Sequence, residues 1–402
     1  MSILVLNAGS STLKFAVFDD DAREELASGL VDWGGGTGPA SVVVRLPGQE
    51  PQRTQLDVAD NSAAVGQILK RLRGAAPTRG VQAWPITIIG HRVVHGGVQF
   101  RDSTLIGARA KTAIAQLSEL APLHNPPALD AIEAAEAALS GIPQVAVFDT
   151  AFFTNLPESA YLYPVPYEWY SNWGVRRFGF HGISHAYCAG RAAELLGRGA
   201  AELRLVICHL GNGCSASAVR GGTAVATTMG FTPLDGLMMG TRPGSLDPGI
   251  LTYIERRHGL TAEDLDHAMN HRSGLLGVSG VSSDFREVER AARAGHERAC
   301  VALEMYAARV RAAIGAMAVT MSGVDAIVFT GGVGENSASL RANVCRGLDC
   351  LGACLDAERN RLARPDADVA SDSSPTRILV VEAREDLAIA REARRLAQTN
   401  VP

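Results

Sequence analysis

The chain has 402 residues and a formal net charge of −4 at pH 7; 47% of its residues are hydrophobic and 20% are charged. This length is too great for one hydrophobic core, so two domains are expected. The charges are mixed with no basic stripe, and apolar stretches are only strand-sized, which excludes nucleic-acid-binding and membrane-spanning classes. Because Met1-Ser2 leads directly into a predicted strand without a secretory leader, a cytoplasmic location is expected.

The first predicted element is a hairpin of two strands. The apolar residues Leu4 to Leu6 are followed by small and hydroxyl residues from Asn7 to Thr12, then by Lys14 and a second apolar run, Phe15 to Phe18. Gly and Ser in such a turn expose backbone N–H groups and hydroxyls that can donate to phosphate oxygens, and Lys14 adds a positive charge. The turn predicts a phosphate contact, although an ordinary hairpin turn would look the same in isolation.

The first half continues with alternating strands and helices. The apolar periodicity predicts a strand over Ser41–Leu46, a helix over Ser62–Arg73 and a buried strand over Ile86–Ile89. A strongly helical segment, Ala128–Leu139, precedes an apolar strand that ends at Asp149. A carboxylate at a strand end is a frequent position for an active-site acid in α/β proteins, so Asp149 is a candidate.

The second half begins with the same plan as the first. An apolar strand over Leu205–Cys208 leads into a turn of Gly, Asn and Ser over Gly211–Ser215, and then into a strand of small residues. Two such strand–turn–strand units, far apart in the chain, indicate an internal duplication.

The chain then continues with helices and strands to its end. A long helical region is predicted over Asp284–Met321, and a later strand enters a Gly-rich loop, Gly331–Asn336, that opens a helix. A last strand and a last helix follow, and this pattern predicts two α/β domains. None of the three Gly-rich segments is a Walker loop or a Rossmann fingerprint, but each follows an apolar strand, which favours a nucleotide site.

A series of sequence blocks resembles those of the acetate kinases, in the order and at the spacing of that family, over essentially the whole chain. The blocks are NAGSSTLKF, HRVVHGG, LAPLHNPP, VFDTAF, RRFGFHGISH, CHLGNGCS, MGFTPLDGLMMGTRPGSLDPG, GVSGVSSDFR and FTGGVGENS. The resemblance implies an α/β fold of two duplicated ribonuclease H-like domains with an interdomain cleft, the superfold of actin-like ATPases and sugar kinases. It implies an N-terminal acceptor-side domain, residues 1–150 joined by the C-terminal helix 385–400, and a nucleotide-binding domain, residues 151–384.

By this resemblance the protein is expected to transfer the γ-phosphoryl group of ATP reversibly to acetate, giving acetyl phosphate and ADP. Mg²⁺, or Mn²⁺ in its place, is the implied cofactor, and a homodimer is the implied assembly, with no nucleic acid or membrane as a partner. Acetate is already an anion at pH 7, so the reaction needs in-line positioning and positive charge rather than a strong base.

The charged site residues of the family match four positions here. Arg92 is implied to bind the carboxylate, Arg242 to stabilise the transition state, and His181 to donate to a phosphoryl oxygen. Asp149 is implied to act as a proton acceptor, as a water-mediated metal ligand or as a residue that orients an arginine, and we expect the orienting role. Further histidine candidates are His95, His124, His209 and, in a structural role, His185.

The resemblance also implies the metal, nucleotide and acyl sites. Asn7 and Glu385 are the implied Mg²⁺ residues, and Ala383-Arg384-Glu385 stands where the family usually has Thr-Asn-Glu. The implied ATP contacts are Lys14, Ser10, Thr12, His209, Leu210, Gly211, Asn212, Gly213, Asp284, Phe285, Arg286, Gly332, Val333, Gly334, Glu335 and Asn336. The implied lining of a small apolar acyl pocket is Val94, Leu123, Phe180 and Pro233.

Two alternatives stay open from the sequence. A propionate or butyrate kinase would share the scaffold, because one methylene changes binding in a pocket by only about 1–3 kcal/mol. Val94 favours acetate, since propionate kinases have a smaller residue there. A non-catalytic, actin-like ATP-binding clamp would bind nucleotide without phosphorylating an acceptor, and the presence of Arg92, Arg242 and His181 argues against it.

Overall fold

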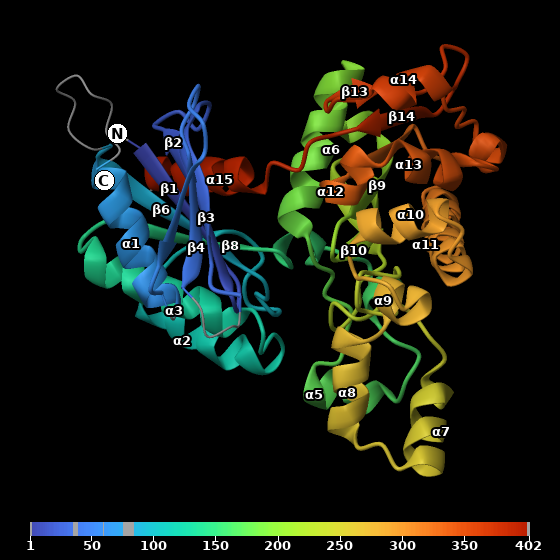
Figure 1. Ribbon diagram of the computed structural model, residues 1–402, viewed down its shortest axis with the longest axis horizontal. Coiled ribbons are helices and arrows are strands. Elements are labelled where there is room, and N and C mark those ends of the chain that lie inside the picture. The colour runs from blue at the N-terminus through green and yellow to red at the C-terminus, as the bar shows by residue number, and fades with distance from the viewer. Residues whose placement is uncertain (1, 35–38, 59, 75–83, 400–402) are drawn as a thin grey trace. The chain divides into compact units, whose positions relative to one another are not determined.

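A computed structural model of the protein describes residues 2–34, 39–58, 60–74 and 84–399 (Figure 1). The internal contacts divide the chain into two compact units, which we call unit 1 (Met1–Thr154 with Arg384–Pro402) and unit 2 (Asn155–Ala383). Each unit contains one β-sheet with helices packed on it, so the fold is mixed α/β. Among the helices described, none is long and apolar enough to cross a lipid bilayer.

Unit 1 is built on a sheet that has eight strands in the described part of the chain. The strands are β1 (Ser2–Ala8), β2 (Thr12–Asp19), β3 (Glu25–Asp32), β4 (Ala40–Arg45), β5 (Gln52–Leu56), β6 (Ile86–Val93), β7 (Thr104–Leu105) and β8 (Gln144–Phe148). Their order across the sheet is β5-β4-β3-β2-β1-β6-β8-β7. β1 and β2 pair antiparallel and confirm the predicted N-terminal hairpin, while β1, β6 and β8 are parallel neighbours.

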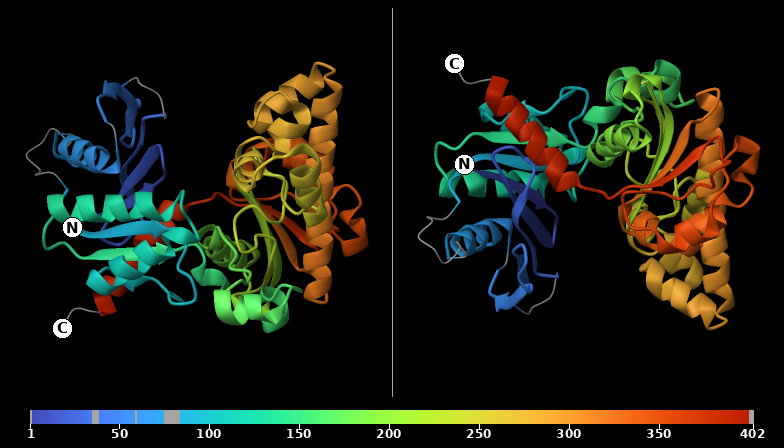
Figure 2. Two further views of the ribbon diagram at one scale, coloured as in Figure 1. Left: turned by 90° about the horizontal axis from the view of Figure 1, so that it is seen from below. Right: turned by 90° about the horizontal axis from the view of Figure 1, so that it is seen from above.

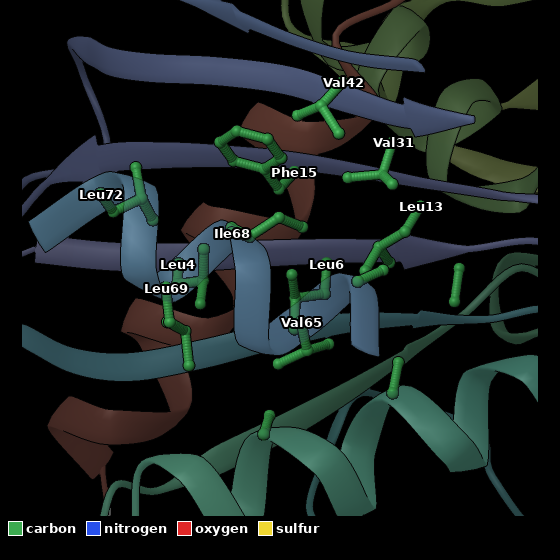
Figure 3. Close-up of a cluster of buried hydrophobic side chains, with 14 of the residues drawn as sticks. Leu4, Leu6, Leu13, Phe15, Val31, Val42, Val65, Ile68, Leu69 and Leu72 are labelled. Carbon is green, nitrogen blue, oxygen red and sulfur yellow. The ribbon is translucent and has the colours of Figure 1, made fainter. Parts of the chain in front are cut away.

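Helices cover both faces of this sheet. They are α1 (Asn61–Gly74), α2 (Ala108–Gln116), α3 (Asn125–Ala138) and α15 (Glu385–Thr399), with 3₁₀ turns at Leu117–Glu119 and Ala151–Phe153. The apolar face of α1 packs on the β1–β2 hairpin around Phe15, and α3 lies beside it (Figure 3). That face repeats at the spacing of an α-helix. It consists of Val65, Ile68, Leu69 and Leu72.

The C-terminal helix α15 covers the opposite face of the unit 1 sheet, where it packs against β1, β6 and β8 (Figures 2 and 3). Gly90 on β6 permits this close approach. A Cβ at that position would lie only 2.6 Å from Cγ2 of Ile389. α15 and β1 lie at opposite ends of the chain, yet their packing fixes α15 on the sheet of unit 1.

Unit 2 is built on a second sheet, with six strands among the residues described. They are β9 (Arg204–Leu210), β10 (Cys214–Arg220), β11 (Thr223–Thr227), β12 (Ala326–Thr330), β13 (Ala367–Asp368) and β14 (Arg377–Val380). β9 pairs antiparallel with β10 and parallel with β12, and β12 pairs parallel with β14. The order β11-β10-β9-β12-β14 in unit 2 therefore repeats the order β3-β2-β1-β6-β8 in unit 1, which confirms the predicted duplication.

Helices also cover both faces of the second sheet, with α6 on one face and α11 on the other (Figures 1 and 2). The helices of unit 2 are α4 (Glu158–Tyr161), α5 (Tyr167–Trp173), α6 (Gly182–Leu196), α7 (Pro248–His258), α8 (Ala262–His271), α9 (Gly274–Ser279), α10 (Phe285–Arg293), α11 (Glu297–Thr320), α12 (Gly331–Asn336), α13 (Ala338–Cys345) and α14 (Ala357–Leu362). Two 3₁₀ turns cover Ala200–Glu202 and Leu348–Leu351.

Two predicted elements differ from the structure. The long helical region is two helices, α10 and α11, because the chain reverses at Gly295, which has a φ of +90° that stops a right-handed helix. The Gly-rich segment Gly331–Asn336 is itself the short helix α12 rather than a loop, and it starts directly after β12. Its glycines place backbone N–H groups at a helix start beside a strand end.

Candidate functional site

Unit 1 carries a buried arginine–carboxylate pair at the ends of two parallel strands. Asp149 directly follows β8, and its Oδ2 accepts hydrogen bonds from Nε (3.0 Å) and Nη2 (2.5 Å) of Arg92. Arg92 lies inside β6, in register with Val147 of β8, rather than after the strand as predicted. The Asp149 side chain is 1% exposed and that of Arg92 is 19% exposed, so one edge of the guanidinium stays accessible.

The guanidinium of Arg92 also contacts the β1–β2 turn. Its Nη1 donates to Oδ1 of Asn7 at 3.3 Å. Asn7 pairs with Lys14 across the hairpin, so the two side chains lie on the same face of the sheet. The turn is closed by a bond from the Gly9 N–H to the Thr12 carbonyl, at 2.7 Å. The predicted phosphate turn and the predicted acceptor arginine are therefore neighbours.

Two carboxylates at the start of α15, Glu385 and Asp386, influence the charge of Arg92. Burial lowers the pKa of Arg92, but Asp149, Glu385 and Asp386 raise it above its ordinary value. Burial and the charge of Glu385 raise the pKa of Asp386 to about 6, against the opposing effects of Lys14 and Arg92. Asp386 was not predicted from the sequence, although an acid directly after Glu385 in the first helical turn was a signal for it.

The donor set of unit 1 fits a hard divalent cation. Mg²⁺ takes oxygen ligands, uses few protein groups and retains several waters. Asn7 offers an amide oxygen, and the repulsion between Glu385 and Asp386 would be relieved by a cation. In the ranges that the structure describes, no group of three or more His, Cys, Asp or Glu side chains could hold a metal by itself.

Unit 2 places His181 against the turn Gly211–Gly213 that joins β9 to β10. His181 precedes α6 with a φ of +58°. A Cβ on Gly213 would lie 3.1 Å from Nε2 of His181, so the ring lies close against the backbone of this turn. The ring also stacks on His209, with the centroids 4.4 Å apart. One edge of the imidazole thus lies at the second predicted phosphate turn.

Buried hydroxyls of β10 hold the other edge of the histidine pair on α6. Nδ1 of His181 lies 2.9 Å from Oγ of Ser215, and Nε2 of His185 lies 2.8 Å from the same oxygen. Nδ1 of His185 lies 2.8 Å from Oγ of Ser217. His185 is fully buried, and burial followed by the influence of His209 holds its pKa well below the ordinary value. A neutral, structural imidazole therefore supports His181.

Arg242 lies on a loop that is bonded to the same turn. The N–H of Gly240 donates to the carbonyl of Asn212 at 3.2 Å. The carbonyls of Met239, Gly240 and Thr241 accept bonds from the start of α9, which pins the loop. Arg242 is half-buried, burial lowers its pKa, and no ion pair to it is found among the described residues. A desolvated cation without a carboxylate partner is suited to receive an anion.

A cavity of about 800 Å³ opens beside the turn, within unit 2. It brings together much of the predicted nucleotide site, and Glu289 enters it because it lies one helical turn after Phe285. The predicted residues that line it are Gly211, Asn212, Asp284, Phe285, Arg286, Gly332, Val333 and Asn336. The lining residues that the sequence analysis missed are Leu275, Ser283, Glu289 and Ser337.

Two of the predicted ATP residues, Asp284 and Arg286, form an ion pair with each other. Asp284 caps α10 by accepting from the N–H of Arg286, and its two oxygens also accept from Nε (3.1 Å) and Nη2 (2.6 Å) of that arginine. This contact lowers the pKa of Asp284 to about 2. The carboxylate is thus ionised and fixed at the cavity, while the Arg286 side chain is 84% exposed.

Glu335 does not line the cavity, in contrast to its neighbours on α12. Its Oε1 accepts from the N–H groups of Gly331 and Ala383, both at 2.9 Å, and burial raises its pKa. The carboxylate thus ties the start of α12 to the last residue of unit 2, next to Arg384 and Glu385 in the chain. The side chain of Glu335 therefore positions α12, and the predicted ATP contact at this residue stays a prediction.

Other predicted ATP residues also lie outside the cavity lining. Leu210 and Gly334 are buried, and a Cβ on Gly334 would meet Cβ of Leu210 at 3.6 Å, so these two positions pack strand against helix. His209 and Gly213 contact His181 instead. Ser10, Thr12 and Lys14 belong to the β1–β2 hairpin of unit 1. The remaining predicted ATP residues belong to unit 2.

The predicted acyl pocket is divided between the units. Val94 is 6% exposed and Leu123 is 46% exposed, and both belong to unit 1. Phe180 is 2% exposed, Pro233 is half-buried, and both belong to unit 2. Neither unit alone contains the four residues, so the pocket stays a prediction.

Two buried histidines beside Arg92 should make the protein sensitive to acid. Burial lowers the pKa of His91 to about 4, against a hydrogen bond to Gln144, and lowers that of His95 to about 4. Unfolded histidine takes up a proton near pH 6.5. The folded pKa values are lower, so their stabilisation is complete above pH 6.5 and is lost as the pH falls towards 4.

We expect the free energy of unfolding to fall by up to about 1.4 kcal/mol per pH unit for each histidine in this window. In His91→Gln the slope between pH 6.5 and 4.5 should be shallower, because one titrating group is gone. Urea unfolding at several pH values measures this slope. The matched control is His258→Gln, which changes an exposed histidine. Identical slopes for wild type and His91→Gln would contradict the argument.

Comparison with known proteins agrees with this geometry. The family model described as the Acetokinase family matches residues 2–391. The chain is 47% identical over 406 residues to the acetate kinase of Cyanothece sp., covering 100% of this chain and 99% of that protein. Crystal structures of Porphyromonas gingivalis acetate kinase (TM-score 0.92, 39% identity) and a Francisella tularensis propionate kinase (TM-score 0.91, 36% identity) each cover 98% of this chain and 99% of theirs.

These similarities extend over both units rather than over one of them, and the similar proteins are named as acetate or propionate kinases. The mixed α/β architecture, with its duplicated sheets, is the architecture of the solved acetate kinases. The chain belongs to the acetokinase family.

Proposed function

We propose that this enzyme is an acetate kinase, which transfers the γ-phosphoryl group of ATP to acetate and yields acetyl phosphate and ADP in a reversible reaction. The observation that carries the proposal is Arg242, a half-buried guanidinium on a loop bonded to the turn beside the 800 Å³ cavity. Relatives that match this chain over its full length are named acetate kinase, and Arg92 of unit 1 could bind an anionic acceptor.

The adenosine would bind in the cavity of unit 2, with the phosphates along the turn Gly211–Gly213. The β1–β2 turn with Lys14 would contact the terminal phosphates, and Asn7 and Glu385 would hold Mg²⁺ through water. When bound, Mg²⁺ neutralises phosphate charge. Ser10 and Thr12 supply hydroxyl and backbone donors in that turn.

The acceptor carboxylate would be held by Arg92. One acetate oxygen forms a bond to the γ-phosphorus as the bond to the β-γ bridging oxygen breaks, and ADP carries away that electron pair. His181 and Arg242 would donate to the equatorial oxygens, where negative charge is spread. Asp149 accepts twice from Arg92 and so orients it, which is the role that we propose for this carboxylate.

A propionate kinase is the second candidate, because the Francisella tularensis propionate kinase has nearly the same fold as this chain. The two activities differ by one methylene in a pocket that we propose is lined by Val94, Leu123, Phe180 and Pro233. The homodimer and the cytoplasmic location also stay predictions from the sequence.

A hydroxamate assay of acyl phosphate formation tests the function. With ATP and Mg²⁺, we expect kcat/KM for acetate to exceed that for propionate by about tenfold or more, and butyrate to be poorer still. A higher kcat/KM for propionate would make this enzyme a propionate kinase. ATP binding with slow hydrolysis and no acyl phosphate would instead favour the non-catalytic clamp. Omission of Mg²⁺ should abolish the signal in either kinase.

A further inference from the structure

We infer that Ser217 is a positioning residue that keeps the imidazole proton of His181 on Nε2, through a relay of hydrogen bonds in unit 2. The relay runs from Ser217 to His185, then to Ser215, then to His181, with contacts of 2.8, 2.8 and 2.9 Å. Only its kinetic consequence rests on the proposed function; the proton position is a property of the protein alone.

The direction of the relay is decided at its buried end. Ser217 is fully buried on β10, and in the described part of the chain its hydroxyl contacts one polar group, Nδ1 of His185. A serine hydroxyl has one proton. If Nδ1 of His185 carried a proton, the hydroxyl of Ser217 would be a buried donor without an acceptor, which costs about 1–3 kcal/mol. Ser217 therefore donates to Nδ1 of His185.

Each following bond is then determined. His185 is fully buried and neutral, so with Nδ1 as acceptor its proton is on Nε2 and is donated to Oγ of Ser215. The single proton of Ser215 must then be donated to Nδ1 of His181. A neutral His181 with Nδ1 as acceptor carries its proton on Nε2.

The proton on Nε2 of His181 has a consequence for phosphoryl transfer. Nε2 is the ring nitrogen that lies against Gly213, in the turn between β9 and β10. In this tautomer the ring presents an N–H donor to an anionic oxygen without first taking up a proton. The other tautomer would present a lone pair, which repels a phosphoryl oxygen. Ser217 thus prepares His181 as a donor although it lies three groups away.

The tautomer can be measured directly in the protein with ¹⁵N-labelled histidine. Long-range ¹H–¹⁵N correlation spectra above pH 7 report which ring nitrogen is protonated, and a His181→Gln spectrum assigns the His181 signals. We expect Nε2 to be protonated and Nδ1 to be unprotonated in the ligand-free wild type. A proton on Nδ1 of His181 would overturn the inference, whether or not the enzyme makes acetyl phosphate.

Ser217→Ala tests the relay at its origin. Without the buried hydroxyl neither direction is preferred, so we expect the second His181 tautomer to appear. The value of kcat should fall about three- to tenfold with little change in KM for ATP or acetate, since only transition-state contacts weaken. Ser217→Thr restores a hydroxyl and should restore both the tautomer and kcat.

Ser184→Ala is the matched control, because it removes a buried hydroxyl from the same first turn of α6, one that contacts Nδ1 of His209 on β9 rather than His185. It should leave the His181 tautomer unchanged. A single Nε2–H tautomer that persists in Ser217→Ala would overturn the role of Ser217. If the wild type formed no acyl phosphate but showed the expected His181 tautomer, the proposed function would be refuted and the inference about the relay would stand.

Discussion

Replacement of Arg242 by alanine is expected to lower kcat for acetyl phosphate formation by about 10³-fold, while KM for ATP changes little. Its guanidinium is half-buried on a loop that is pinned by the start of α9 and bonded to Asn212 of the phosphate turn. An arginine placed at a transferring phosphoryl group contributes 10³–10⁵-fold in phosphoryl-transfer enzymes. Because its contact strengthens as charge moves onto the equatorial oxygens, its loss lowers kcat rather than ATP affinity.

Two further variants separate charge from general disruption. Arg242→Lys keeps one positive charge but loses the planar donor fork, so it should recover only part of kcat. Arg220→Ala, an exposed arginine at the other end of β10, should keep nearly full activity. A hydroxamate assay gives kcat, and circular dichroism verifies folding. A kcat for Arg242→Ala above about a tenth of wild type would contradict the assigned role.

The duplicated fold was predictable from local sequence because each half repeats the same short-range signals. In each half an apolar strand, a turn of Gly and small polar residues, and a second strand follow one another. The predicted turns are Asn7–Thr12 and Gly211–Ser215, and the structure has a hairpin at each of them. The sequence did not reveal the break between α10 and α11. Residues on both sides of this break have good helical periodicity, whereas the backbone leaves the helical conformation from Ala294 to His296.

The sequence predicted many of the residues that line the cavity of unit 2, but not which side chains contact other parts of the protein. The family pattern marks Glu335 as part of a Gly-rich nucleotide segment, but its carboxylate accepts from Ala383, far away in sequence. Whether a side chain on α12 turns to the cavity or to the core depends on the strands packed behind it. Asp386 was also not predicted, because the burial that raises its pKa depends on how α15 packs on strands that are far away in sequence.

The hydrogen-bond relay from Ser217 to His181 could be predicted from the sequence only in part. His181 directly precedes α6 and His185 lies in its first turn, while Ser215 and Ser217 are two apart on β10 and share a face of the sheet. Both spacings can be read from the sequence. That these residues meet depends on the packing of α6 on the sheet of unit 2, which no local pattern contains.

Arg92→Ala is expected to raise KM for acetate by at least about tenfold and to lower the free energy of unfolding by about 3–5 kcal/mol. The activity effect follows from loss of a charge-assisted contact to the acceptor carboxylate. The stability effect has a separate cause, because the Asp149 side chain is 1% exposed and would lose both hydrogen bonds that it accepts from Arg92. The two effects should therefore respond differently to a second substitution.

The double variant Arg92→Ala/Asp149→Asn makes this separation measurable. Replacement of the buried Asp149 carboxylate by a neutral amide should restore much of the lost stability, whereas KM for acetate should stay high, since the binding group is still absent. Urea unfolding and acetate kinetics on wild type, both single variants and the double variant complete the cycle. Equal stability of Arg92→Ala and the double variant would show that Asp149 is not left as a buried charge. An unchanged KM for acetate in Arg92→Ala would remove Arg92 from the acceptor site, because an acceptor that does not contact this guanidinium has no reason to bind less tightly when it is lost.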